Sequence, residues 1–253
     1  MGNYKQFIRE RICCGETNGT YGDSVVWIIK VSPQTQGPSI KTMVNVFVLS
    51  DMHFEEQAKE IKRLYYKYNA RRVVLDANGL GIGLVDYMIK SQDSKGDHYP
   101  PFGVENDDEG YYKKFITDDT ELEAMHLLKM HAPENTDAHA TLQNQLNAGK
   151  LKFLIDERTA QAKLLSTKVG QAMSQEQRNA YLKPYVLTSV LKDQMMNLRE
   201  DEEGINIRLK QVNSRIKKDF FSALEYGVYY LKYYEDNKTR KKRRKLSDFM
   251  FLS

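Results

Sequence analysis

Three short apolar segments open the chain. Residues 11–16 (RICCGE), 24–31 (SVVWIIKV) and 42–50 (TMVNVFVLS) have the composition of strands, and turn-forming polar residues separate them. Because consecutive strands with short connections usually pair with each other, the pattern predicts three antiparallel strands.

A helical pattern follows at 54–69, and its apolar residues fall on one face. Residues 71–76 (RRVVLD) then form an apolar run without alternation, which is typical of a strand buried on both faces in the parallel part of a sheet. A glycine-rich turn at 77–83 and a helix at 84–92 come next. This order predicts an α/β fold: a mixed sheet, antiparallel in its first three strands and joined by a parallel central strand, with helices on its faces.

The rest of the chain alternates between helical and extended patterns. Helices are expected at 119–148 (with a break near Ala132 and Pro133), 157–169, 174–182, 186–201 and 218–235, and strands at 102–104, 151–155 and 204–212. The strand at 204–212 alternates, and its expected apolar positions are Ile205, Ile207, Leu209 and Val212.

Charge is distributed unevenly along the chain. The 38 Lys and Arg residues exceed the 34 Asp and Glu residues by four, but seven positive charges lie between Lys238 and Lys245, so the remainder carries −3. A mildly acidic body argues against a histone-like protein whose whole surface coats DNA. We predict one domain over residues 1–236 and a basic tail over residues 237–253.

Several classes of protein are not expected. No apolar run approaches the roughly 18 to 20 residues that span a bilayer, and the N-terminus lacks the pattern of a signal peptide. Cys13 and Cys14 are the only cysteines, so a disulfide framework or a cysteine zinc site is not expected. The five histidines show no zinc-binding spacing. We therefore expect an intracellular protein with no membrane partner.

Asp76 is the first candidate for chemistry. It ends the buried strand and precedes a glycine-rich turn, at the edge where open α/β sheets place their sites. The turn Gly79–Gly83 lacks the spacing of a dinucleotide-binding loop, and the chain has no GxxxxGK[ST] phosphate loop. The alternative interpretation is that Asp76 only caps the following helix.

Three further acids lie at element ends. Glu16 ends the first strand, Asp23 precedes the second and Asp219 begins the last helix; each also has a simpler explanation as a solvated or helix-capping acid. An acid on the first strand, one on the central strand and one on a late helix converge in few folds, among them the ribonuclease H-like fold. Such carboxylates repel one another unless cations bridge them, and their oxygens suit Mg²⁺ or Mn²⁺. Two such ions about 4 Å apart activate water and stabilise the leaving oxygen in phosphodiester hydrolysis.

Four stretches together resemble the nuclease domain of tailed-phage terminase large subunits, the DNA-packaging motors. They are RICCGETNGTYGDSVVWIIK, EEQAKEIKRLYYKYNARRVVLDANGLGIG, GKLKFLIDERTAQAKLL and SRIKKDFFSALEYGVYYLK. The resemblance implies that Glu16, Asp76 and Asp219 are catalytic residues that bind two Mg²⁺ or Mn²⁺ ions, and that Asp23 is a supporting metal ligand.

The resemblance also implies a function. It is that of a metal-dependent endonuclease that cuts double-stranded phage DNA concatemers during genome packaging in the host cytoplasm, with Lys217 and Lys218 beside Asp219 in contact with phosphates. Its implied partners are a terminase ATPase domain or subunit, the portal and the small terminase subunit. A Holliday-junction resolvase of the same fold is an alternative that the FSALEYG helix disfavours.

Two departures from the family pattern support a different hypothesis. The first-strand acid is usually Asp in a run like ADIA, whereas this chain has Glu16 in GETN; the longer side chain shifts the carboxylate. The ATPase phosphate loop of the full-length family protein is also missing. The alternative is a DNA-binding and assembly module of a split terminase with a weakened metal site.

The basic tail has three interpretations. Lys241, Lys242, Arg243 and Arg244 could bind DNA phosphates without sequence preference. The tail could instead dock on a packaging partner, or be solvated without a specific role.

Overall fold

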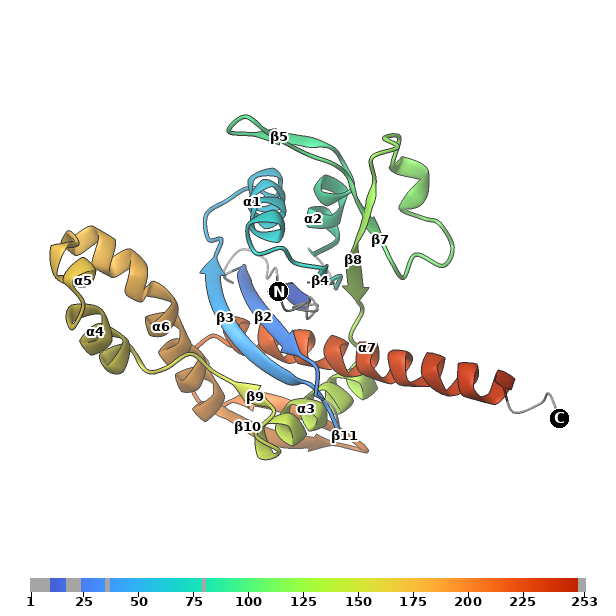
Figure 1. Ribbon diagram of the computed structural model, residues 1–253. Helices are drawn as coiled ribbons and strands as arrows, with labels where there is room; N and C mark the ends of the chain where they lie inside the picture. The colour runs from blue at the N-terminus through green and yellow to red at the C-terminus, as the bar shows by residue number, and fades with distance from the viewer. Residues whose placement is uncertain (1–9, 17–23, 35–36, 79–80, 250–253) are drawn as a thin grey trace.

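The computed structural model describes residues 10–16, 24–34, 37–78 and 81–249, and only the backbone at 10–16, 202–203 and 238–249. A seven-stranded sheet forms its centre (Figure 1). Its strands are β1 (Glu10–Glu16), β2 (Val25–Ser32), β3 (Ile40–Val48), β4 (Arg72–Asp76), β7 (Phe102–Val104), β8 (Leu122–Leu128) and β9 (Leu151–Lys152). Two small hairpins are formed by β5 (Gln92–Ser94) with β6 (Asp97–Tyr99) and by β10 (Leu198–Glu203) with β11 (Asn206–Gln211). The helices are α1 (Phe54–Lys67), α2 (Gly81–Met88), α3 (Ala132–Asn147), α4 (Glu157–Leu165), α5 (Lys168–Ala172), α6 (Gln175–Met196) and α7 (Asp219–Phe249), with a 3₁₀ turn at Lys113–Phe115.

The strand order is β7-β8-β4-β1-β2-β3-β9. As predicted, β1, β2 and β3 pair antiparallel, and β4 lies parallel to β1. The sheet then extends through parallel pairs of β4 with β8 and of β8 with β7, while β9 joins β3 at the other edge. The chain therefore has a mixed α/β fold in which β4 is a central parallel strand.

Alternation along the strands creates one hydrophobic core on each face of the sheet. On β2, Val26 and Ile28 pack with α1 and α2, whereas Val25, Trp27 and Ile29 pack with α3, α6 and α7. Successive side chains of a strand point to opposite faces, so one apolar run supplies both cores. Figure 1 shows the same layers, with α1 and α2 on one side of the sheet and α7 crossing the other.

Helix α7 is longer than the predicted helix at 218–235. It continues to Phe249, across the proposed boundary between residues 236 and 237, and its C-terminal part extends beyond the sheet (Figure 1). The basic run 238–245 thus lies on helical backbone. The division into a domain and a tail stays a prediction. Among the described residues, no helix has the length and apolar character needed to cross a membrane.

The prediction of one helical region over 119–148 was wrong in its first part. Residues 122–128 form β8, between β4 and β7, and the buried strand contacts both cores. A short run buried on both faces has no alternation, so its periodicity does not distinguish a strand from a helix. The break before α3 was correct, because His131 and Glu134 form a capping box there and Pro133 lies in the first turn.

The region before α7 also needed correction. The predicted helices at 174–182 and 186–201 are one helix, α6, which passes through Pro184, and its buried residues Thr188, Leu191 and Gln194 all lie after the proline. It ends at Met196, and 198–203 (LREDEE) forms β10 instead of helix. A two-residue turn with Gly204 at φ 66° joins β10 to β11.

Strand β11 is shorter than the predicted strand at 204–212. Ile205 and Val212 are 96% and 66% exposed, because Ile205 lies in the turn and Val212 follows the strand. Leu209 does pack against the core on the α7 face.

Lys62 on α1 is fully buried, although it carries an amine. Its Nζ donates to the carbonyl oxygens of Lys90 at 2.6 Å and Pro100 at 2.9 Å, and it lies over the ring of Phe102. Burial lowers the pKa of Lys62 from 10.5 to about 7. Above pH 7 the side chain of Lys62 is therefore mainly a neutral amine. Its two hydrogen bonds connect α1 to the loops before and after the β5–β6 hairpin.

We expect this group to make stability rise with pH. Between pH 7 and 10.5 the unfolded chain keeps the proton on Lys62 and the folded chain does not, so the free energy of unfolding increases by up to about 1.4 kcal/mol per pH unit. Urea unfolding at several pH values measures how the free energy of unfolding changes with pH. In Lys62→Met the increase between pH 7 and 10.5 that Lys62 contributes should vanish from this slope. Lys67→Met, at an exposed position on the same helix, should leave the slope unchanged; equal slopes in wild type and Lys62→Met would contradict the assignment.

Candidate functional site

The ends of β1 and β4 place two of the candidate acids side by side along the backbone. In the parallel pairing Gly15 lies beside Leu75, so Glu16 and Asp76 are the next residues on adjacent strands. Neighbouring strands lie about 4.8 Å apart. The side chain of Glu16 and the whole of Asp23 lie outside the described residues.

Asp76 is half-buried on the face of the sheet that α7 covers. Val74, two residues earlier, packs in the core on that face, and alternate side chains of a strand share a face. The Oδ1 atom of Asp76 accepts a hydrogen bond from the backbone N–H of Asn78 at 2.9 Å. Burial raises the pKa of Asp76 above its ordinary 3.8, and the bonds from Asn78 offset this only in part. The alternative interpretation requires Asp76 to lie at the N-terminus of α2. That helix begins only at Gly81, so Asp76 is not at its N-cap position.

Asp219 begins α7 and is 4% exposed. The first turn of α7 is fixed from two sides: the Trp27 indole N–H donates to the Phe220 carbonyl at 2.9 Å, and the Phe221 N–H donates to Gln194 Oε1 at 3.1 Å. Trp27 lies opposite Cys14 in the β1–β2 pairing, two residues before Glu16. The start of α7 therefore lies against the same end of the sheet as Glu16 and Asp76.

The structure thus brings the backbone of three candidate acids to one region. Among the described residues, no three His, Cys, Asp or Glu side chains form a group able to hold a metal ion. The side chains of Glu16 and Asp23 lie outside the described residues, so this result does not test the predicted metal cluster, which stays a prediction.

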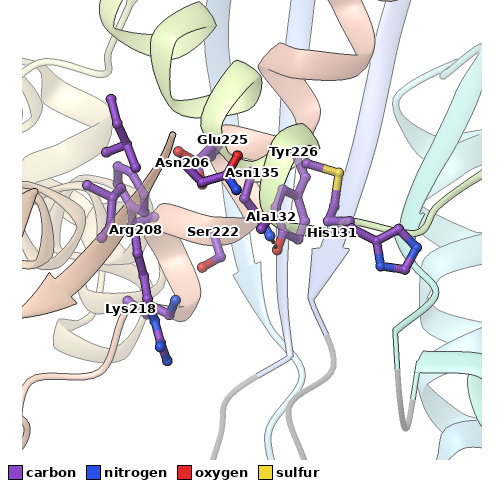
Figure 2. Close-up of a pocket in the computed structure, with 13 residues that line it drawn as sticks. His131, Ala132, Asn135, Asn206, Arg208, Lys218, Ser222, Glu225 and Tyr226 are labelled. Carbon is purple, nitrogen blue, oxygen red and sulfur yellow. Dashed lines mark hydrogen bonds between the residues drawn. The ribbon is translucent and has the colours of Figure 1, made fainter. Parts of the chain in front are cut away.

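Next to this region, a pocket of about 330 Å³ lies between α3, the first turns of α7 and β11. Lys218 and Arg208 lie on one side of it and His131 on the other, with Ser222 and Asn135 between them (Figure 2). Lys217, also predicted to bind phosphate, is exposed and does not line this pocket. The side chains of Lys241, Lys242, Arg243 and Arg244 lie outside the described ones, so their role is untested.

A group of one histidine and two acids borders the same pocket through the buried Glu225 and was not found from the sequence; Glu200 in this group is exposed. His139 Nε2 lies 2.9 Å from Glu200 Oε1, and its Nδ1 lies 3.6 Å from Glu225 Oε1. Glu225, and to a lesser extent Glu200, raise the pKa of His139, whereas burial raises the pKa of Glu225. These residues come from α3, β10 and α7, and no local spacing links them. For Arg208, by contrast, its polar position between Ile207 and Leu209 on an alternating strand was a usable signal.

The structure is that of an α/β protein in which the ends of β1 and β4, with the backbone of Glu16 and Asp76, lie near the start of α7. No protein-family model matches the chain, and the comparison with curated proteins finds no match. Among solved structures, the chain is similar to the large terminase nuclease from thermophilic phage G20c with bound magnesium. The TM-score is 0.51 at 12% sequence identity, and the likeness covers 87% of this chain and 81% of that chain. The likeness shows that the two proteins share a fold.

Proposed function

We propose that this chain is the nuclease of a phage terminase, a metal-dependent endonuclease of ribonuclease H-like architecture that cleaves double-stranded DNA concatemers during packaging. The observation that carries the proposal is the backbone position of Glu16 and Asp76 at the ends of adjacent strands, with buried Asp219 at the start of α7 against the same end of the sheet. The fold shared with a magnesium-bound terminase nuclease supports it.

The described carboxylates are chemically suited to divalent cations. Asp76 is a half-buried acid whose pKa is raised by burial, so a cation beside it would relieve the cost of its ionisation. Glu16, Asp76 and Asp219 would hold two Mg²⁺ or Mn²⁺ ions, with Asp23 assisting. When bound, such ions supply an activated water and stabilisation of the leaving oxygen.

The chain's own residues would position the DNA. Lys218 and Arg208 line the pocket beside Asp219, within the same neighbourhood as the proposed metal ligands, and would contact backbone phosphates. Lys217 is exposed beside them, and Lys241, Lys242, Arg243 and Arg244 on the α7 extension would add salt-dependent affinity for DNA.

The proposed setting is the host cytoplasm during virion assembly. The partner that supplies ATP hydrolysis would be a terminase ATPase domain or subunit, and the portal and small terminase subunit would be further partners. These assignments follow from the proposed function.

One observation favours a second candidate function, a DNA-binding and assembly module. Glu16 stands where the family resemblance leads us to expect an aspartate, and a glutamate side chain is longer than an aspartate side chain by one methylene. This second function requires DNA binding without metal-dependent cleavage.

Two substitutions of Glu16 test the proposed nuclease against the second candidate function. We expect the purified chain to nick supercoiled plasmid in Mn²⁺ but not in EDTA, and Glu16→Gln to lose at least about 100-fold of the rate, since even outer-shell partners of metal ligands contribute 10- to 100-fold. Glu16→Asp, the matched control, should retain or increase the rate. Equal nicking by wild type and Glu16→Gln would refute the site. Salt-sensitive DNA binding by wild type without nicking would instead support the second function.

A further inference from the structure

A second concave surface lies farther along α7, toward its C-terminus, and shares Met130 with the pocket described above. It is a groove of about 880 Å³ between the loop 106–112, the end of β8 and the middle of α7. We call it the acidic groove. Its acids are Asp107, Asp108, Glu109 and Glu134, and its tyrosines include Tyr111, Tyr229 and Tyr233.

Two acids of this groove already have hydrogen-bond partners within the chain, and two are exposed to solvent. Asp107 accepts hydrogen bonds from the backbone N–H groups of residues 111–113, and Glu134 belongs to the capping box of α3. Asp108 and Glu109 are exposed, and the ion pairs among the described side chains include neither of them. A neighbouring concave surface shares residues 107–109 and adds Glu105, Glu121 and Glu123. The loop therefore presents excess negative charge to solvent.

The tyrosines that line the acidic groove, like its acids, favour a positively charged partner. Tyr111 is 55% exposed and Tyr233 is 52% exposed, and Tyr229 lies one helical turn before Tyr233 on α7. The ammonium group of Lys114 already lies 4.3 Å from the centre of the Tyr111 ring. Tyrosine faces attract Lys and Arg side chains, and exposed carboxylates attract the same residues. Both features point to a segment rich in Lys and Arg as the occupant.

The chain itself contains such a segment, with seven positive charges in Lys238–Lys245. It lies on the part of α7 that extends beyond the sheet (Figure 1). Because Tyr233 and Lys238 belong to one continuous helix that runs away from the groove, the basic run cannot reach the acidic groove of its own chain while α7 stays helical. A second copy of the chain has no such restriction.

We propose that two copies associate through antiparallel α7 helices, each placing its basic run in the acidic groove of the other. A twofold axis near residue 237 sets Lys241 of one copy at the level of Tyr233 of the second copy, and the reverse contact follows from the symmetry. The interface is isologous and electrostatic, so it weakens as salt rises. DNA phosphates compete for the same basic run, which couples association to DNA binding.

A charge exchange tests this pairing. The groove variant carries Asp108→Lys and Glu109→Lys, and the tail variant carries Lys241→Glu and Arg244→Glu. We expect wild type to sediment as a salt-sensitive dimer, and each variant alone to dimerise about 100-fold more weakly, since like charges across an interface cost several kcal/mol. An equimolar mixture of the two variants should restore a dimer, and so should all four changes in one chain.

The control is Asp93→Lys with Asp97→Lys, which changes the net charge equally at exposed positions on the β5–β6 hairpin and should leave dimerisation unchanged. Restoration on mixing requires both variants to be folded, so a folding defect cannot imitate it. A wild-type chain that stays monomeric at low salt overturns the proposal. So does a dimer that survives in the tail variant, because its interface then lies elsewhere.

Discussion

Asp76→Asn is expected to lose at least about 100-fold of metal-dependent cleavage while making the metal-free protein more stable. Burial penalises the charged form of Asp76 and raises its pKa, and an amide has no charge to bury. The amide oxygen still accepts from the Asn78 N–H, so the turn after β4 is retained. The loss of activity has the size expected for a metal ligand, whose contribution exceeds that of outer-shell partners.

The sign of the stability change follows from linkage. A carboxyl whose folded pKa is raised favours folding while protonated, and this stabilisation is lost as pH rises through the folded pKa. At neutral pH wild type therefore bears the cost of a buried charge that Asp76→Asn avoids.

Thermal unfolding with and without Mn²⁺ separates the two effects. Wild type should be stabilised by Mn²⁺, because a ligand bound only to the folded state raises its melting temperature, and Asp76→Asn should respond much less. Asp93→Asn, an exposed acid on the β5–β6 hairpin, serves as the matched control and should behave as wild type. Full cleavage by Asp76→Asn, or an unchanged Mn²⁺ response, would remove Asp76 from the site.

The sequence was most informative where one local pattern determined the outcome. The opening strands, α1 and β4 were predictable because their apolar residues repeat with the period of the element or form an uninterrupted run. The end of β4 also predicted the position of Asp76, since a polar residue after a buried run marks the edge of the sheet.

The elements and side-chain groups that the sequence did not predict depend on tertiary contacts. β8 was mistaken for helix because a strand buried on both faces lacks alternation, and β10 is so acidic that only pairing with β11 makes it a strand. The bond from Trp27 to Phe220 joins residues 193 positions apart, and no spacing reveals it, although it fixes the start of α7. The grouping of His139 with Glu200 and Glu225 is equally non-local.

Glu235→Ala is expected to destabilise the fold by about 3–5 kcal/mol, because it leaves a buried lysine without its counter-charge. The side chain of Lys41 on β3 is 0% exposed, and its Nζ lies 2.9 Å from Glu235 Oε2 and 3.2 Å from Gln145 Oε1. This one ammonium group therefore connects β3 to α7 and α3. Urea unfolding measures the change as a lower midpoint at an unchanged slope.

Two comparisons make the expected loss specific to a buried charge. Asp137→Ala removes the acid from an exposed ion pair between the same helices, 2.8 Å from Lys232, and should cost less than about 1 kcal/mol. Lys41→Met combined with Glu235→Ala should recover most of the stability, since replacing both members of a buried pair removes the cost of desolvation as well as the attraction. If the double variant were as unstable as Glu235→Ala alone, the loss would come from the packing of α7 on the sheet and not from the unpaired ammonium group.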